Sequence, residues 1–223
     1  MSKYRLINEC GPRNVRLNLR QLNASEVEAD YLPLRYATLH CELKWTNRPT
    51  TLPSELRDAY DESALKYGIY RETTILAAIR LIIADRTDRL PSGAYFPHPF
   101  QTSGRLAEVS KAMVCPLARK LGLFTALLLE CEIQALKNEV NRLFISVIDT
   151  DRVRRLLREE GFQVFGLPFY FDDQKISPKD SAVLFFKQVY TDEQLIQSLV
   201  KRQESILSHA QSILNSKVEF SAE

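Results

Sequence analysis

Polar and aromatic residues whose side chains could take part in a reaction recur through the first half of this 223-residue chain. In chain order they are Arg35, Trp45, Asp58, Asp61, Arg80, Glu108, Ser110 and Lys111. A carboxylate buried in a sheet can have the raised pKa that suits a general base, and Glu108 lies within an otherwise apolar, strand-like segment. An arginine can hold a carboxylate through two parallel hydrogen bonds. These residues are therefore candidates for acid–base work and for binding a polar substrate.

The same residues also have structural interpretations. Glu108 could be a charged residue on a hydrated face, or the buried partner of Lys111 or Arg80. The Asp58 and Asp61 pair could cap or form a turn around a loop, since aspartate side chains bond readily to nearby backbone groups. Spacing alone leaves both interpretations open.

Composition limits the class of protein. With 45% hydrophobic residues the chain can bury one substantial core, so we expect a single domain over residues 1–223. A net charge of +2, from 30 basic and 28 acidic residues, argues against a nucleic-acid-binding protein. No stretch approaches the roughly 18 uninterrupted apolar residues of a membrane span, and the N-terminus has no signal-peptide run. We expect a cytoplasmic protein without a membrane span.

Neither the cysteines nor the histidines form a metal-binding pattern. The cysteines at positions 10, 41, 115 and 131 are widely spaced, and the histidines at 40, 98 and 209 share no helical spacing. Zinc sites need ligands at close, regular intervals. We therefore predict reduced, buried thiols and no metal.

Hydrophobic periodicity predicts a mixed sheet with helices on both faces. A Ser25-x-x-Glu28 capping signature predicts a first helix, preceded by a weak strand or mobile arm over residues 1–30. Strands are predicted at 64–70, 73–83, 106–114, 143–148, 162–167 and 181–189, the first two forming a hairpin. Further helices are predicted at 116–138, at 149–160 between Thr150 as N-cap and Gly161 as stop, and at about 191–214 with a Thr191-x-x-Gln194 capping box. The proline-containing loop 84–104 is long enough to indicate a functional or mobile segment.

The ordered polar residues resemble the acyl-homoserine-lactone synthase family. That family has an Arg, a Trp ten residues on, an Asp-x-aromatic-Asp, an Arg-Leu pair and a Glu-x-Ser-Arg. This chain reads Arg35, Trp45, Asp58-Ala-Tyr60-Asp61, Arg80-Leu81 and Glu108-Val-Ser110-Lys111. Residues 154–166 are similar to the penultimate helix and following strand of the GNAT scaffold. The resemblance implies an α/β (α+β) GNAT-type fold, with a mainly antiparallel twisted sheet and helices on both faces.

What the resemblance implies chemically is acyl transfer from a thioester to an amine. An amine is protonated near pH 7 and cannot attack until a base removes its proton, which is the role implied for Glu108. The thioester carbonyl gathers negative charge during attack, and backbone N–H groups near residues 113–116 could stabilise it. Pro116 itself has no N–H to donate.

The resemblance also implies which residues bind the acceptor: Arg35, Trp45, Asp58, Asp61, Arg80, Ser110 and Lys111. The resemblance implies that Arg80 and the two aspartates orient the polar acceptor. Arg35 and Trp45 close a mobile lid over it. Trp45, the only tryptophan, could instead pack in the core.

Three departures from the family bear on the acceptor. The family has an aromatic residue where this chain has Leu39 and an arginine where it has Lys111, and the acidic residue before the Asp pair, Glu55, sits one position out of register. Those positions help to shape the S-adenosylmethionine pocket of the lactone synthases. The related N-acyl amino acid synthases share the scaffold and accept an intact amino acid, and we favour that acceptor. S-adenosylmethionine with lactone closure remains an alternative, as does a GNAT-like module that binds a partner without catalysis.

The donor is expected to be the acyl-phosphopantetheine arm of an acyl carrier protein, with no cofactor bound to the chain itself. GNAT acetyltransferases hold coenzyme A pyrophosphate on a Gly-rich turn. The corresponding stretch here, residues 116–122, has one glycine and two cations. The cations expected to meet an acidic carrier are Arg119, Lys120, Arg154, Arg155 and Arg158, with the alternative of a hydrated helix face balanced by Glu159 and Glu160.

Large apolar residues of the second half could line an acyl tunnel or simply form the core. They are Leu121, Phe124, Leu127, Leu128 and Phe144. An apolar stripe at helical spacing is core in most proteins. The sequence leaves the two possibilities open.

Overall fold

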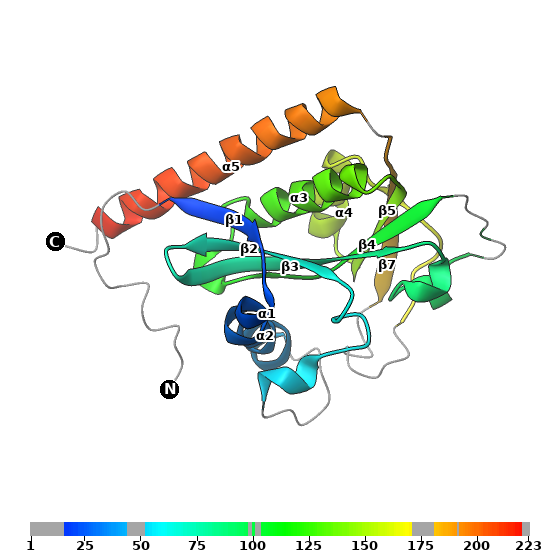
Figure 1. Cartoon of the computed structure of the whole chain (residues 1–223), viewed down its shortest axis with the longest axis horizontal. Helices are drawn as coiled ribbons and strands as arrows, with labels where there is room; N and C mark the ends of the chain where they lie inside the picture. The colour runs from blue at the N-terminus through cyan, green and yellow to red at the C-terminus, as the bar shows by residue number, and fades with distance from the viewer. Residues whose placement is uncertain are drawn as a thin grey trace.

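A seven-stranded sheet runs through the centre of the molecule in the computed structural model (Figure 1). The structure describes residues 16–43, 52–97, 100, 104–170, 181–190 and 192–219. The strands, in sheet order, are β1 Leu17–Gln21, β2 Leu65–Arg71, β3 Thr74–Ala84, β4 Arg105–Val114, β5 Val140–Ile148, β7 Ala182–Gln188 and β6 Gln163–Val164. β4 and β5 pair in parallel, and the other neighbouring strands pair antiparallel. This mixed, mainly antiparallel sheet confirms the predicted fold class.

The predicted hairpin is present as β2 and β3, joined by Glu72 and Thr73. Glu72 adopts a positive φ of 53°, the left-handed conformation that a tight two-residue hairpin turn favours. The first part of β3 is buried without alternation, because helices cover both faces of the sheet. The predicted strand at 162–167 is reduced to the two residues of β6.

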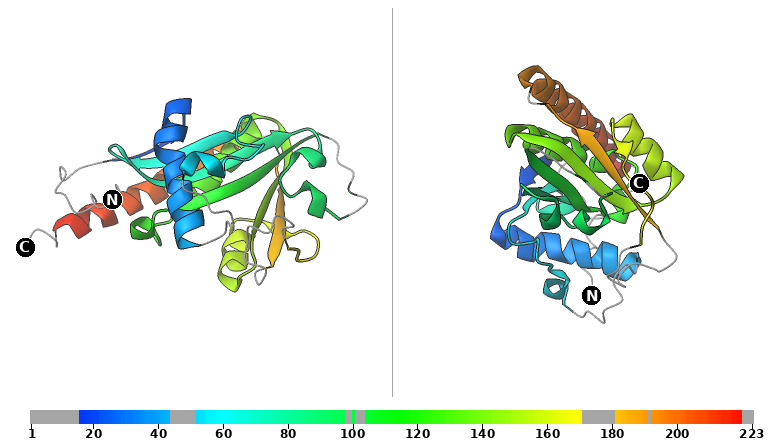
Figure 2. Two further views of the ribbon diagram at one scale, coloured as in Figure 1. Left: turned by 90° about the horizontal axis from the view of Figure 1, so that it is seen from below. Right: turned by 90° about the vertical axis from the view of Figure 1, so that its right-hand side faces the viewer.

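A continuous N-terminal helix, Ala24–Glu42, lies across one face of the sheet (Figure 2). It consists of α1 Ala24–Glu26, the π-helical turn η2 Val27–Tyr31, α2 Leu32–Arg35 and the π-helical segment η3 Tyr36–Glu42. The predicted capping box at Ser25 is two residues late. Asn23 is the N-cap, accepting from the backbone N–H of Glu26 while the Glu26 side chain accepts from the Asn23 N–H.

Three helices cover the opposite face: α3 Leu123–Lys137, α4 Asp151–Glu159 and α5 Glu193–Glu219 (Figure 1). α3 begins later than predicted because a 3-10 turn, η7 Pro116–Ala118, follows β4, and Gly122 at a φ of 77° precedes the helix. α4 matches the prediction, with the Thr150 hydroxyl accepting from a backbone N–H and Gly161 at a φ of 82° after it. α5 is capped by Asp192, whose carboxylate accepts from the Gln194 N–H, and Thr191 lies outside the described residues.

The long segment between β3 and β4 is not structureless where it is described. It contains the 3-10 turns η5 Thr87–Arg89 and η6 Gly93–Tyr95, and it covers a small apolar cluster with Phe96 and Phe144 at its centre. Another 3-10 turn, η4 Pro53–Leu56, precedes β2. In the described part of the chain, no helix is long and apolar enough to cross a membrane.

Candidate active site

Four charges from three segments form an ion cluster, defined as Arg35, Asp58, Asp61 and Arg80, of which all but the partly exposed Asp58 are buried. Arg80 Nη1 donates to Asp58 Oδ1 at 2.6 Å and to Asp61 Oδ1 at 2.8 Å. Arg35 donates from Nη1 to Asp61 Oδ2 at 2.8 Å and from Nη2 to Asp58 Oδ2 at 3.2 Å. The sequence motif thus meets in space although Arg35 lies in the N-terminal helix and Arg80 in β3.

The two aspartates also build the turn that presents them. The Asp58 N–H donates to Asp61 Oδ2 at 2.9 Å, and the Tyr60 N–H donates to Asp58 Oδ1 at 3.0 Å. Burial alone would raise the pKa of Asp61, but the guanidinium groups of Arg35 and Arg80 outweigh burial and lower it to about 2. The turn interpretation from the sequence is therefore correct, and both carboxylates are ionised at neutral pH.

Arg80 is held by protein groups instead of being open to a ligand. Its side chain is 1% exposed, and besides the two aspartates it donates from Nε to Ser110 Oγ at 2.9 Å. A two-bond hold on a ligand carboxylate would compete with these contacts. The structure thus places Arg80 and Ser110 together in the site, with Arg80 fixing the loop of Asp58 and Asp61 against β4.

β4 carries a bulge beside the ion cluster. Arg80 pairs with Ser110 and Ala78 pairs with Met113, so two β4 residues, Lys111 and Ala112, stand opposite one residue of β3. Lys111 has a φ of 51°, in the left-handed region. A bulge of this kind bends its strand and redirects the backbone groups around it.

Beyond the bulge, β4 separates from β5. Their parallel pairing ends at Val109 and Ile145, yet β4 continues to Val114 and β5 to Ile148. The facing edges of the two strands are therefore free of strand partners over these described residues, and such edges can receive an extended chain. The expected donors at 113–116 are partly committed, because the Cys115 N–H donates to the Leu76 carbonyl at 2.8 Å.

Glu108 is fully buried at the start of this opening. Its Oε2 accepts from the Ser92 N–H at 3.0 Å and the Ser92 hydroxyl at 2.8 Å, and its Oε1 accepts from the Ser146 hydroxyl at 3.2 Å. Burial raises its pKa, against the opposing effect of these hydrogen bonds. Glu108 is thus neither on a hydrated face nor ion-paired with Lys111 or Arg80.

Ser146 connects Glu108 to the separated strands. It is the first β5 residue after the last β4–β5 pair, and its side chain is partly exposed. Sequence reasoning missed Ser92 and Ser146, because a serine in a loop or a strand carries no distinguishing signal. The geometry gives Glu108 a hydroxyl-mediated route to a ligand in the opening.

Lys111 is a partly buried cation that makes no hydrogen bond or ion pair with any residue the structure describes. Burial, together with the nearby Arg35 and Arg80 charges, lowers its pKa to about 8. A cation in this position attracts an anionic group. Lys111 is therefore better placed than Arg80 to meet a ligand carboxylate.

Tyr31, which the sequence did not single out, lies fully buried beside the ion cluster. Its hydroxyl has no hydrogen-bond partner among the described residues, and burial raises its pKa to about 12. An unsatisfied buried hydroxyl costs about 1–3 kcal/mol. It is a neutral, unsatisfied donor next to Arg35 and Arg80.

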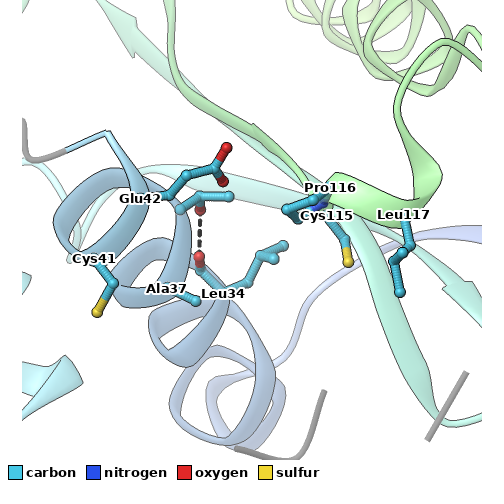
Figure 3. A pocket seen from close by; sticks show the side chains of 8 residues that line it. Leu34, Ala37, Cys41, Glu42, Cys115, Pro116 and Leu117 are labelled. Atoms are coloured by element: carbon cyan, nitrogen blue, oxygen red, sulfur yellow. Dashed lines mark hydrogen bonds between the residues drawn. The ribbon is translucent and has the colours of Figure 1, made fainter. Parts of the chain in front are cut away.

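A pocket of about 330 Å³ opens between the N-terminal helix and the loop after β4 (Figure 3). It is lined by Leu34, Ala37, Thr38, Cys41, Glu42, Cys115, Pro116 and Leu117. Arg119, from that loop, donates to both carboxylate oxygens of Glu42 at 2.5 and 2.6 Å. Trp45, expected near this helix, lies outside the described residues.

The cations assigned to a carrier lie in the loop after β4 and along α4, with Arg158 in the last turn of that helix. Because β4 and β5 are parallel, the loop after β4 with Arg119 and Lys120 and the start of α4 lie at the same strand ends. Arg154 is paired with Asp149, whereas Arg155 and Arg158 are exposed. Glu160, proposed to balance α4, instead binds Arg202 of α5 at 2.6 and 2.8 Å.

The apolar residues proposed for an acyl tunnel do not border one channel. Leu127 and Leu128 are buried in the core under α3. Phe144 points to the opposite face of the sheet, in the cluster with Phe96. Core packing therefore accounts for them. No group of metal-binding side chains occurs among the described residues.

No protein-family model and no curated protein sequence matches this chain. Among solved structures it is similar to FeeM, an N-acyl amino acid synthase from uncultured soil microbes, with a TM-score of 0.62 and 16% identity over 79% of this chain and 92% of that one. It is also similar to BjaI, a CoA-dependent acyl-homoserine lactone synthase, with a TM-score of 0.62 and 16% identity over 88% of this chain and 99% of that one. A putative phosphinothricin N-acetyltransferase gives a TM-score of 0.55 and 18% identity over 79% of this chain and 99% of that one. The chain therefore has the GNAT-type acyltransferase fold.

Proposed function

We propose that this chain is a cytoplasmic N-acyltransferase that moves an acyl group from the phosphopantetheine thioester of an acyl carrier protein to the amino group of an amino acid. The observation that carries the proposal is the bulged β4 separating from β5 beside Glu108 and the ion cluster. Free strand edges on both sides of the opening suit an extended, amide-containing donor arm. The bulge then sets the thioester beside the polar groups that an amine acceptor needs.

In the proposed reaction, the acceptor ammonium first loses a proton to Glu108, through the Ser146 hydroxyl that bonds to it at 3.2 Å. The raised pKa of this buried carboxylate suits it to accept a proton. The amine nitrogen then bonds to the thioester carbon and the carbon–sulfur bond breaks. The nitrogen gives its second proton to the leaving thiolate as the amide forms, and Glu108 releases the first proton to solvent, so that it returns to its ionised form.

The acceptor carboxylate is assigned to Lys111 and Tyr31. Both lie beside the ion cluster without hydrogen-bond partners among the described residues. Arg35 and Arg80 donate their described hydrogen bonds to protein groups. In this proposal they position the turn of Asp58 and Asp61 and contribute positive electrostatic potential to the site. An amino acid offers the carboxylate and the amine that this arrangement would hold.

The proposed carrier docks on the exposed side of α4 that bears Arg155 and Arg158. Both side chains are exposed, and an acidic partner would be steered to them. Arg119 already closes an ion pair with Glu42, so its assigned role is to fix the loop after β4 to the N-terminal helix.

A second candidate is an acyl-homoserine-lactone synthase that uses S-adenosylmethionine. The similarity to BjaI favours it, because at the same TM-score that structure covers 88% of this chain against 79% for FeeM. The departures at Leu39 and Lys111 favour the amino acid.

The test is product analysis by mass spectrometry. The purified chain is incubated with an acylated carrier protein or acyl coenzyme A, and with either mixed amino acids or S-adenosylmethionine. We expect N-acyl amino acids, and we expect Glu108→Gln to lower turnover by about 10²-fold or more with an unchanged circular dichroism spectrum. Glu204→Gln, at an exposed position of α5, is the matched control and should keep full turnover.

A homoserine lactone with released methylthioadenosine would select the second candidate. Acylation from coenzyme A alone would overturn the carrier assignment. No acylated product from any combination would overturn the acyltransferase itself.

A further inference from the structure

The pocket between the N-terminal helix and the loop after β4 is apolar in character. Leu34, Ala37, Pro116 and Leu117 supply hydrocarbon surface from its two sides (Figure 3). Thr38 offers no free donor, since its hydroxyl already donates to the Leu34 carbonyl. A volume of about 330 Å³ falls within the range of small-molecule sites.

The charge at the rim of the pocket is already neutralised. Glu42 accepts two hydrogen bonds from Arg119, which makes a charge-assisted pair. A charged ligand group pushed into the pocket would lose its hydration and find no opposite partner there. The pocket therefore suits a neutral, apolar group.

The pocket lies on the same face of the sheet as the ion cluster. In the pairing of β3 with β4, Ser110 is opposite Arg80 and Met113 is opposite Ala78. Cys115 lies two residues beyond Met113 and shares its face, because side chains alternate along a strand. On the helix side, Leu34 and Thr38 flank Arg35 within about one turn, or roughly 5 Å of rise. The pocket and the ion cluster therefore lie under the same helix on the same face of the sheet.

The position of the pocket distinguishes this tail from the acyl chain. The Cys115 N–H donates to the Leu76 carbonyl of β3, so the pocket wall at Cys115 lies on the side of β4 that faces β3. The proposed donor arm enters on the other side of β4, where it separates from β5. The acceptor, beneath the N-terminal helix, is therefore the closer occupant.

We infer that this pocket binds the side chain of the acceptor, and that the acceptor is an amino acid with an apolar side chain. The inference rests on the proposed function, because it names the substrate class of the same site. The side chain fills the pocket, and the carboxylate is directed toward the Lys111 ammonium.

The experiment measures equilibrium binding to the full chain without any acyl donor, so that it does not depend on catalysis. Ligand-observed NMR or calorimetry compares leucine and phenylalanine with glycine, aspartate and lysine. Burying an apolar side chain of this size predicts at least ~10-fold tighter binding of leucine or phenylalanine than of glycine. The three other amino acids should bind weakly and similarly.

Two variants test the pocket directly. Ala37→Phe fills it, and should remove the preference for leucine over glycine while leaving glycine binding unchanged. Ala29→Phe, an exposed position on the same helix, is the matched control and should change nothing. If Ala37→Phe does not fold, Leu117→Asp is the second variant, because Leu117 is 58% exposed and a charge there should weaken leucine binding without disturbing the core.

Equal binding of apolar and charged amino acids, an unaltered preference in Ala37→Phe, or no binding of any amino acid would each overturn the inference. The inference would also be overturned if Ala37→Phe changed which acyl chains are transferred but not which amino acids are acylated, because the pocket would then hold the acyl chain. Preferential binding of leucine without any acyl transfer would support the pocket and count against the proposed function. Equal acylation of leucine, glycine and aspartate would support the proposed function and count against the pocket as the site of the acceptor side chain.

Discussion

Replacing Arg80 by methionine tests whether the ion cluster holds the fold together or contacts the ligand. Methionine keeps an apolar stem but removes three hydrogen bonds, to Ser110, Asp58 and Asp61, from a side chain that is 1% exposed. Removing one partner of a buried ion pair costs about 3–5 kcal/mol. Asp61 keeps its contact with Arg35 at 2.8 Å, so we expect a loss near the lower limit, about 3 kcal/mol in the free energy of unfolding.

The loss is measured by urea unfolding followed by circular dichroism at pH 7, and in a thermal scan it corresponds to a decrease in Tm of ~6–12 °C. Arg86→Met is the matched control, because the ion pair of Arg86 with Asp88 is exposed and should contribute within about 0.5 kcal/mol. Adding Asp58→Asn to Arg80→Met should cost less than the sum of the two single changes by about 1 kcal/mol or more. A stability loss below about 1 kcal/mol, combined with lost activity, would refute the reasoning and return Arg80 to a ligand-binding role.

Three further predictions concern groups beside the ion cluster and on α4. Tyr31→Phe should leave the free energy of unfolding unchanged or raise it by up to ~1 kcal/mol, because the lost hydroxyl has no partner in the described residues, yet raise the KM for the acceptor several-fold. Lys111 is protonated below its pKa of about 8, so the KM for the acceptor should rise in the wild type as the pH increases above 8. In Lys111→Arg the KM should stay constant over this range, because arginine remains charged; steady-state kinetics as a function of pH measures both. Reversing Arg155 and Arg158 to Glu should raise the KM for the carrier protein, and added salt should weaken the wild type in the same way; equal KM values would contradict carrier steering.

Local signals in the sequence predicted the elements that depend on local chemistry. The helix α4 follows from a capping threonine and a terminal glycine, and the β2–β3 hairpin from two β-compatible runs. The N-terminal capping box was misplaced because two overlapping segments satisfy the same pattern. The structure selects Asn23 and Glu26, and Ser25 instead donates its hydroxyl to the Asn23 side chain at 2.6 Å. Local pattern alone does not decide between such neighbours.

The sequence predicted which residues come together better than it predicted the partner of each side chain. Most of the motif residues do meet, but the partner that each side chain chooses is a long-range property that spacing does not encode. Arg80 was expected to hold the acceptor, and in the structure its guanidinium donates hydrogen bonds to Asp58 and Asp61. Ser146 and Tyr31 carry no sequence signal, because their importance arises only from the fold around them.

The backbone at Lys111 supports the proposed ligand-binding role of its side chain. Four described non-glycine residues have a positive φ, and three of them, Glu72, Lys120 and Glu139, lie in turns. Lys111 lies inside a strand, where the left-handed conformation costs a residue with a Cβ roughly 1–2 kcal/mol and a glycine almost nothing. The bulge itself would thus be formed more easily by glycine. A strained backbone that carries a partly buried cation without an ion-pair partner among the described residues is the combination expected where a side chain binds or orients a ligand.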